Sequence, residues 1–179
     1  QEIATILPKE VFEIYGRKMK EYAESPVFQY TLKRGDTFPD FSLPDETGAF
    51  CSSVDLLVSS YDYLVVTFFR GGWCGFCNTE LAVLNRYVPE FRAKNAAFVA
   101  IAPQKVEQNM ETRKKMNLGF PLLQDEDCEF AQLCNIAYVL DEELRPFASD
   151  IPSYNGNDDW IIPIPATFVV RGSDRKIMY

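Results

Sequence analysis

Two cysteines separated by two residues, Cys74 and Cys77, carry the most distinctive chemistry in this sequence. They lie in the stretch RGGWCGFC, between an apolar run at 63–69 and a helical pattern. We therefore expect Cys74 at the N-terminus of a helix and Cys77 one turn further along the same face. The positive end of the helix dipole stabilises a thiolate and lowers the pKa of Cys74. Such a thiolate attacks S–S or O–O bonds, and the second thiol then closes a disulfide.

Residues next to the pair are candidates for supporting roles. Arg70 would add positive charge beside the thiols if its side chain points inward. Trp73 and Phe76 are expected to flank the thiols and shape a docking surface. The apolar segment 160–162 either extends that surface or belongs to the core. Glu80 either shuttles a proton or is simply solvated.

Two other interpretations of the cysteines are weaker. A zinc site is disfavoured, because the sequence has no histidine and no second Cys-x-x-Cys, and we expect no metal and no cofactor. Inert packing is the second alternative, since free cysteine is often buried. Packing is favoured for the three remaining cysteines, Cys51, Cys128 and Cys134.

Composition narrows the function further. The absence of histidine excludes Ser-His-Asp and Cys-His hydrolysis. The net charge of −8 argues against nucleic-acid binding and against anionic membrane surfaces. An odd number of cysteines does not suggest a secreted disulfide scaffold. No long apolar run and no targeting signal is visible, so we expect a cytoplasmic protein without a membrane span.

Hydrophobic periodicity predicts an α/β chain. We expect strands at 63–69, 96–102, 137–140 and 166–170, and helices at 10–25, 77–91, 104–117 and 127–135. Residues 35–50 should form short strands and turns, and 171–174 a hairpin turn into a last strand. Residues 149–159 are expected to form a loop, and the basic side chains of 104–117, Arg113 among them, a solvated face. Crossover connections between the strands make part of the sheet parallel, which gives a three-layer α/β domain.

Two short motifs resemble the thioredoxin fold. WCGFC at 73–77 is similar to the thioredoxin active site, with Phe76 in place of its proline. IPATF at 164–168 resembles the proline before a strand that lies against the cysteines in that fold. The resemblance implies that Pro165 supports the site, with a cis peptide bond before it.

The larger pattern resembles the peroxiredoxin-like alkyl hydroperoxide reductase/thiol-specific antioxidant family. The motifs, in the order of that family, are GDTFPDFSLPDETG at 35–48, VVTFFRGGWCGFCNTEL at 65–81, NLGFPLLQDEDCEFAQLCNI at 117–136 and ATFVV at 166–170. The resemblance implies a thioredoxin-like fold, with a central mixed sheet flanked by helices. It also implies a redoxin domain at 35–179, preceded by an N-terminal helix and extension at 1–34.

This chain departs from the family at the helpers of peroxide activation. In the motif Pro-x-x-x-Thr-x-x-Cys the peroxide-attacking cysteine falls on Cys77, the threonine on Cys74 and the proline on Arg70. The supporting arginine falls on Pro165, so that charge would have to come from Arg70 or Arg171. The site chemistry favours Cys74 as the nucleophile, whereas the family pattern points to peroxide as the acceptor.

Three functions remain open from the sequence. The first is a thiol-dependent antioxidant enzyme that reduces hydroperoxides and is reset by an external thiol such as a thioredoxin. The second is a protein disulfide oxidoreductase, in which Cys74 attacks and Cys77 resolves. The third is a redox-sensing module without catalysis. A homodimer is compatible with each of them.

Overall fold

The computed structural model describes residues 9–25, 29–59 and 61–179. Residues 1–8 and 26–28 of the expected N-terminal extension lie outside the described residues. The helices are α1 (Lys9–Ala23), α3 (Ser53–Ser59), α4 (Gly75–Ala93), α5 (Val106–Met116), α6 (Glu129–Leu133) and α7 (Ile151–Asn155), with 3-10 turns η2 (Glu126–Cys128) and η3 (Glu142–Phe147). The strands are β1 (Ser42–Pro44), β2 (Phe50–Ser52), β3 (Tyr63–Phe68), β4 (Ala96–Ala102), β5 (Leu122–Gln124), β6 (Ala137–Val139), β7 (Ile161–Pro163) and β8 (Ala166–Arg171).

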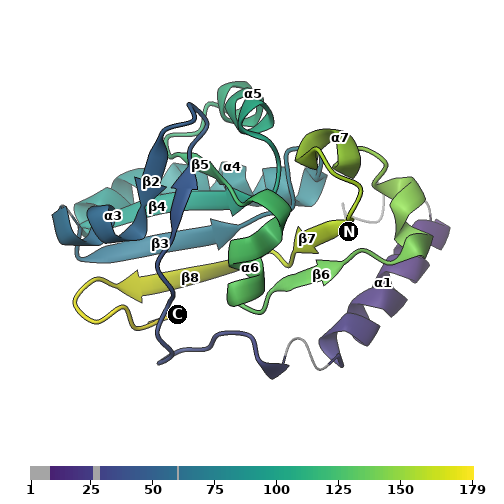
Figure 1. The fold of residues 1–179 in the computed structure, drawn as a ribbon, viewed down its shortest axis with the longest axis horizontal. Helices are drawn as coiled ribbons and strands as arrows, with labels where there is room; N and C mark the ends of the chain where they lie inside the picture. The colour runs from purple at the N-terminus through teal and green to yellow at the C-terminus, as the bar shows by residue number, and fades with distance from the viewer. Residues whose placement is uncertain (1–8, 26–28, 60) are drawn as a thin grey trace.

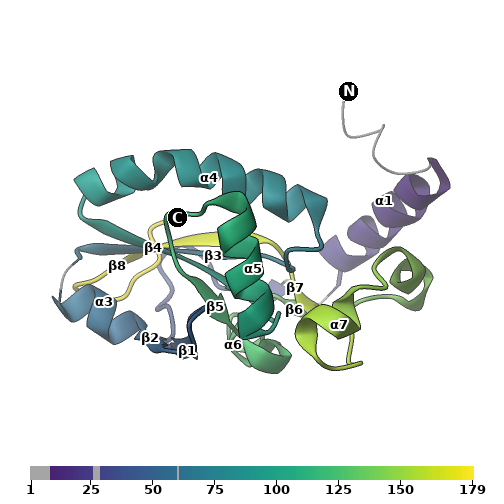
Figure 2. The same cartoon turned by 90° about the horizontal axis from the view of Figure 1, so that it is seen from above.

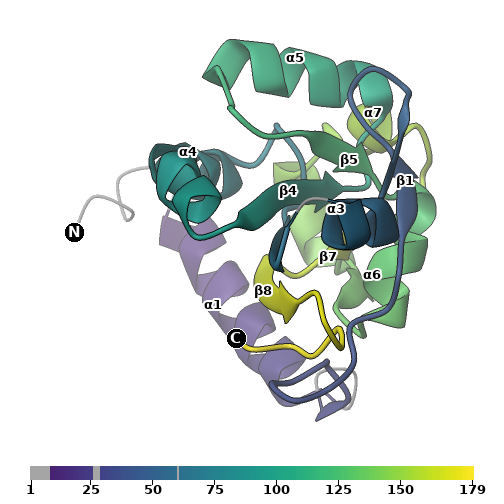
Figure 3. The same cartoon turned by 90° about the vertical axis from the view of Figure 1, so that its left-hand side faces the viewer.

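A mixed sheet in the order β5-β4-β3-β8 forms the centre of the molecule (Figure 1). Strand β3 runs parallel to β4, and β4 parallel to β5, whereas β8 is antiparallel to β3. Helices α4 and α5 make the two parallel crossovers. Figure 3 shows α4 on one face of the sheet and α3 with α6 on the other. The expected three-layer, thioredoxin-like α/β fold is thus confirmed.

Strand β3 is buried on both faces, as its continuous apolar run predicts. Leu64 and Phe68 pack in the cluster that includes Phe130 of α6. Val65 points the other way and shares a second cluster with Leu81 of α4. Because side chains alternate along a strand, both sets are buried only when layers cover both faces. The carboxyl end of β3, where the cysteine motif begins, is therefore held in the interior.

The segment between α6 and β8 differs most from expectation. Residues 137–140 do form a strand, but β6 pairs with β7 in a separate two-stranded antiparallel sheet. The 149–159 segment, expected as a loop, contains α7, which ends at Gly156 with a φ of 85°. Helices as short as α7 and η3 are too brief to produce a periodic apolar pattern, so the sequence could not reveal them.

Two smaller expectations also need correction. The turn at 171–174 is present, but the residues after it make isolated bridges, Thr37 with Lys176 and Val170 with Ile177, instead of a full strand. Arg113 is not purely solvated, because it pairs with the buried carboxylate of Glu46 in the turn between β1 and β2. The helix pattern shows a polar face, but it cannot show that a buried acid from another segment meets it.

Helix α1 lies at the end of the central sheet, close to β6 and η3 (Figure 2). Its side chains Ile14 and Tyr15 pack on a small core of Leu140, Leu144, Ile151 and Ile162. No helix in the described part of the chain combines the length and apolar character that crossing a membrane requires.

Candidate active site

The cysteine motif forms a tight turn between β3 and α4. Gly71 has a φ of 138°, a conformation that side chains disfavour. A Cβ on Gly72 would clash with Oγ1 of Thr112 on α5, so a larger residue would require the turn or the Thr112 side chain to shift. The turn delivers Cys74 to the N-cap position of α4, in an extended conformation (φ −86°, ψ 106°). The two glycines thus set where the first thiol lies.

A buried glutamine braces this turn from the segment just after the neighbouring strand β4. Oε1 of Gln104 accepts a hydrogen bond from the Gly72 N–H at 2.7 Å, and Nδ2 of Asn78 donates to the Gly72 carbonyl at 2.8 Å. Nε2 of Gln104 in turn donates to Oδ1 of Asn109 at 2.7 Å. Gln104 was not among the site residues predicted from the sequence. Its position just after the parallel strand β4 was the available signal, because carboxyl ends of parallel strands share one edge.

The two thiols are in direct contact. The Cys77 thiol donates to Sγ of Cys74 at 2.8 Å, and the Cys77 N–H donates to the same sulfur at 3.4 Å. Both side chains are buried, and both cysteines are free thiols here. The expectation that Cys74 starts the helix, with Cys77 one turn in and within reach, is confirmed.

The pKa values of the two thiols are driven apart. The hydrogen bond from the Cys77 thiol lowers the pKa of Cys74 to about 6, against the opposing effect of burial, and the charge of Arg70 lowers it further. The same thiol–thiol hydrogen bond raises the pKa of Cys77 well above its ordinary value, and burial adds to this. At neutral pH the pair therefore carries one thiolate, on Cys74, and one protonated thiol, on Cys77.

Arg70 points inward, which was the condition for it to add positive charge beside the thiols. Its side chain is only 7% exposed, and Nη1 donates to the Tyr15 hydroxyl over 3.5 Å. The guanidinium carbon lies 6.0 Å from the ring centres of both Tyr15 and Trp73. Nε of Arg70 has no hydrogen-bond partner among the described residues. The other candidate, Arg171, pairs with Asp174 in the terminal turn.

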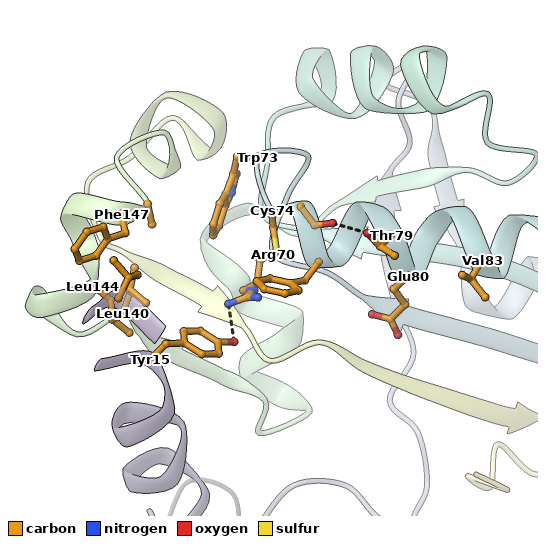
Figure 4. A pocket seen from close by; sticks show the side chains of 14 residues that line it. Tyr15, Arg70, Trp73, Cys74, Thr79, Glu80, Val83, Leu140, Leu144 and Phe147 are labelled. Carbon is orange, nitrogen blue, oxygen red and sulfur yellow. Dashed lines mark hydrogen bonds between the residues drawn. The ribbon is translucent and has the colours of Figure 1, made fainter. Parts of the chain in front are cut away.

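Cys74 opens onto an apolar pocket of about 610 Å³ (Figure 4). The walls come from α1, from the start of α4 and from the segment around η3. The lining residues that matter below are Val11, Tyr15, Arg70, Val83, Leu144 and Phe147. Glu80 also lines this pocket at an exposed position. A buried thiol that borders such a space can meet a small acceptor without unfolding of the site.

A second pocket of about 320 Å³ borders Cys77. Phe76, 37% exposed, lines both pockets, and Trp73 lines the larger one, so both aromatic residues flank the thiols as expected. Pro165 also lines the smaller pocket. Residues 160–162 serve chiefly as core, since Ile162 is fully buried.

The prediction of a cis peptide bond before Pro165 is wrong: the described residues contain no cis bond. The chain runs from β7 directly into β8 on an extended course. Such a course asks for no tight turn, and a trans bond is then the lower-energy isomer by about 0.5–1 kcal/mol. Pro165 lines the smaller pocket in the trans form, so the resemblance to the thioredoxin fold does not extend to the peptide bond at this position.

The remaining cysteines lie away from the pair. Cys128 and Cys134 are buried in the core on the α6 side of the sheet. Burial raises the pKa of the Cys128 thiol and raises the pKa of Cys134 to about 12. Burial likewise raises the pKa of the half-buried Cys51. These thiols stay protonated near neutral pH, in keeping with a packing role.

Comparison with known proteins gives a family match over most of the chain. Residues 34–179 match the model of the AhpC/TSA family. A 1-Cys peroxiredoxin of Dictyostelium discoideum is 29% identical over 115 residues, which are 61% of this chain and 46% of that protein. The putative peroxiredoxin bcp of Helicobacter pylori is 30% identical over 102 residues, which are 57% of this chain and 65% of that protein. The matches thus span about half to two thirds of these relatives.

Solved structures agree on the fold. The peroxidoxin BcpB of Mycobacterium tuberculosis is 25% identical, with a TM-score of 0.66, and the match covers 82% of each chain. A cysteine-to-serine mutant of PrxQ from Xylella fastidiosa superposes with the same TM-score at 17% identity, over 83% of this chain and 84% of that one. The match to the family model begins at residue 34, so α1 lies outside it.

Proposed function

The chain belongs to the AhpC/TSA family, and from this premise we propose that it is a thiol-dependent peroxide reductase. In this proposal Cys74 attacks the peroxide and Cys77 resolves the product. The observation that carries the proposal is the asymmetry of the pair. Cys74 receives both hydrogen bonds, has the lowered pKa and borders the larger pocket.

The first step is oxygen transfer to Cys74. The thiolate displaces alkoxide or hydroxide from the O–O bond of the hydroperoxide, and Cys74 becomes a sulfenic acid. The leaving oxygen takes a proton and departs as alcohol or water. Arg70 is the cation beside the reacting sulfur and is suited to stabilise the negative charge that passes to the leaving oxygen.

The second step closes the disulfide. The Cys77 sulfur attacks the sulfenic sulfur of Cys74, its proton leaves with the hydroxyl group as water, and a Cys74–Cys77 bond forms. The two sulfurs already touch at 2.8 Å, so the step needs little movement of the chain. An external dithiol, such as a thioredoxin, then supplies two electrons and two protons that restore both thiols. The homodimer and the cytoplasmic location expected from the sequence remain predictions.

Protein disulfide reduction is the second candidate. It is favoured by the N-terminal position of the low-pKa thiol and by the exposed edge of Phe76 beside it. In that reaction Cys74 attacks a sulfur of the protein substrate, and Cys77 releases the mixed disulfide. The two candidates use the same residues and end in the same internal bond, so the acceptor must be identified by experiment.

Trapping the oxidised cysteine tests the proposal. The variant Cys77→Ser keeps a hydroxyl donor beside Cys74 but has no resolving thiol. After one equivalent of hydrogen peroxide it should carry a dimedone-reactive sulfenic acid on Cys74, located by peptide mass spectrometry. Cys134→Ser is the control, since it removes a thiol distant from the pair and should still form the Cys74–Cys77 disulfide. A dimedone adduct on Cys77 of Cys74→Ser, formed at the wild-type rate, would instead assign the attack to Cys77.

A further inference from the structure

Helix α1 supplies part of the wall around the redox pair, although it lies outside the family match. Val11 and Tyr15 line the larger pocket, and Tyr15 with Phe12 lines the smaller one. Tyr15 is therefore the α1 residue common to both spaces, and it lines the larger pocket together with Cys74 and the smaller one together with Cys77. A helix added to the family domain thus reaches the chemistry of that domain.

The group that Tyr15 touches is the buried Arg70. No ion pair joins Arg70 to a carboxylate in the part of the chain that the structure describes. The guanidinium instead lies between two aromatic side chains, Tyr15 from α1 and Trp73 from its own turn, each with its ring centre 6.0 Å away. A buried cation without a carboxylate depends on such contacts for its position, and a cation near an aromatic ring is attracted to it.

The position of α1 is itself fixed by a polar network. Nζ of Lys18 lies 2.7 Å from an Asp141 carboxylate oxygen and 3.4 Å from one of Glu143, and the Arg17 guanidinium lies 2.7 Å from Glu143. The Tyr22 hydroxyl accepts a hydrogen bond from the Asp141 N–H at 3.0 Å. Exposed pairs are individually weak, but several that converge on one loop fix the helix in register. Tyr15 is consequently held over Arg70 rather than placed there by chance.

We propose that Tyr15 is a positioning residue that holds the Arg70 guanidinium beside Cys74, so that α1 is a working part of the redox centre. Tyr15 contacts Arg70 through its hydroxyl and its ring, and it acts through Arg70. The inference rests on the proposed role of Cys74 as the reactive thiolate, but not on which acceptor that thiolate attacks. It explains how this chain can support its thiolate although proline stands at the position of the family's supporting arginine.

Other titratable groups among the described residues also face the pair. Cys77 and Glu80 face the site from α4, and Tyr138 of β6 lies close enough to Arg70 for its pKa, which burial raises, to be lowered by the guanidinium. Tyr15 also contributes to the pKa of Tyr138, but burial keeps that pKa above its ordinary value, so Tyr138 stays neutral in the pH range of the test. A shift in the titration of Cys74 after a substitution at Tyr15 would therefore report on Arg70.

The experiment measures the titration of Cys74 in variants of the whole chain. Tyr15→Leu removes the ring and the hydroxyl, whereas Tyr15→Phe removes the hydroxyl alone. The pH profile of iodoacetamide alkylation, with thiolate absorbance at 240 nm as a second readout, gives the fraction of thiolate without any peroxide. Tyr87→Phe is the matched control, because it removes a hydroxyl from an exposed tyrosine of α4 that lines neither pocket.

Tyr15→Leu should reduce the thiolate fraction of Cys74 at pH 6 by roughly threefold to tenfold, as loss of a neighbouring cation does, and Tyr15→Phe by less. Tyr87→Phe should titrate like the wild type. In Arg70→Met, adding Tyr15→Leu should cause no further loss, since Tyr15 acts only through Arg70. A wild-type midpoint in Tyr15→Leu with an intact circular dichroism spectrum would overturn the proposal. So would equal losses from Tyr15→Leu with and without Arg70.

The same data separate this inference from the proposed function. A normal peroxide rate in a Tyr15→Leu variant with wild-type titration would leave the peroxidase proposal intact and remove the role of Tyr15. If the titration of Cys74 is shifted in Tyr15→Leu but the protein does not react with peroxide, the role of Tyr15 stands and the peroxidase proposal fails. If Tyr15→Leu fails to fold, the comparison of Tyr15→Phe with Tyr87→Phe decides the matter, with equal midpoints counting against the proposal.

Discussion

Sγ of Cys74 accepts two hydrogen bonds from a single residue, the thiol of Cys77 at 2.8 Å and the N–H of Cys77 at 3.4 Å. Because both donors come from one residue, a negative charge is favoured on Cys74 and disfavoured on Cys77. The spacing of the two cysteines creates this relation, since a helix places the N–H of the fourth residue over its N-cap side chain. The roles of thiolate on Cys74 and protonated thiol on Cys77 are therefore set before any acceptor binds.

The pH dependence of alkylation should show directly that Cys74 is the residue that carries the thiolate. The thiolate of Cys74 forms as the pH rises through a pKa of about 6, so its alkylation should increase up to about pH 7 and then level off. Cys77→Ala removes the thiol donor and should move the midpoint up towards the ordinary value for cysteine. Cys77→Ser keeps a donor and should lie between the two. A wild-type midpoint near 8.5, the value for free cysteine, would show that the thiolate is not stabilised.

Replacing Arg70 should weaken both the thiolate and the reaction. Arg70→Met fills the same space without the charge, and the loss of a nearby cation should raise the Cys74 midpoint, with about tenfold less thiolate at pH 6. Arg70→Lys keeps a charge but not the planar contact with the aromatic rings, so it should recover only part of the effect. An Arg70→Met protein with an unchanged midpoint would mean that the hydrogen bonds from Cys77 suffice.

The glycine turn should be intolerant of a single methyl group. In Gly72→Ala the new Cβ would clash with Oγ1 of Thr112, which is itself buried, so we expect the turn and the Cys74 thiol to be displaced. Misplacement of this kind should slow the reaction of Cys74 roughly a hundredfold. Thr112→Ala removes the obstructing hydroxyl, and the double variant should recover much of the rate. Failure of the second substitution to help would show that the contact with Thr112 is not the cause.

The ion pair between Arg113 and Glu46, remote from the thiols, should affect the stability of the fold but not the reaction of Cys74. Arg113 pairs with Glu46, whose buried carboxylate also accepts the Leu122 N–H at 3.0 Å. Arg113→Met leaves that carboxylate unpaired and should cost about 2–3 kcal/mol in urea unfolding, below the full value for a buried pair because Arg113 is partly exposed. Lys114→Met, next along the exposed side of the helix, should change stability by less than about 0.5 kcal/mol. A similar effect of both substitutions would contradict the pairing.

The sequence predicted those parts of the structure that depend on local pattern. The run at 63–69 could be recognised as a central strand because both of its faces are apolar, and the position of Cys74 followed from the strand and helix on either side. Contacts between distant segments could not be predicted in this way. The pattern of α1 shows that one face is buried, but not that this face covers Arg70. The isomer before Pro165 also depends on the surrounding course of the chain, and the resemblance to the thioredoxin fold misled there.

The rate of reaction with peroxide tests the central claim most directly. Trp160→Phe leaves Trp73 as the single tryptophan, adjacent to Cys74, and its fluorescence reports oxidation in stopped flow at several hydrogen peroxide concentrations. The account predicts a second-order rate constant far above that of free cysteine thiolate at the same pH, lost in Cys74→Ser and retained for one turnover in Cys77→Ser. A rate constant equal to that of free cysteine thiolate would contradict peroxide reduction and leave disulfide exchange as the function of the pair.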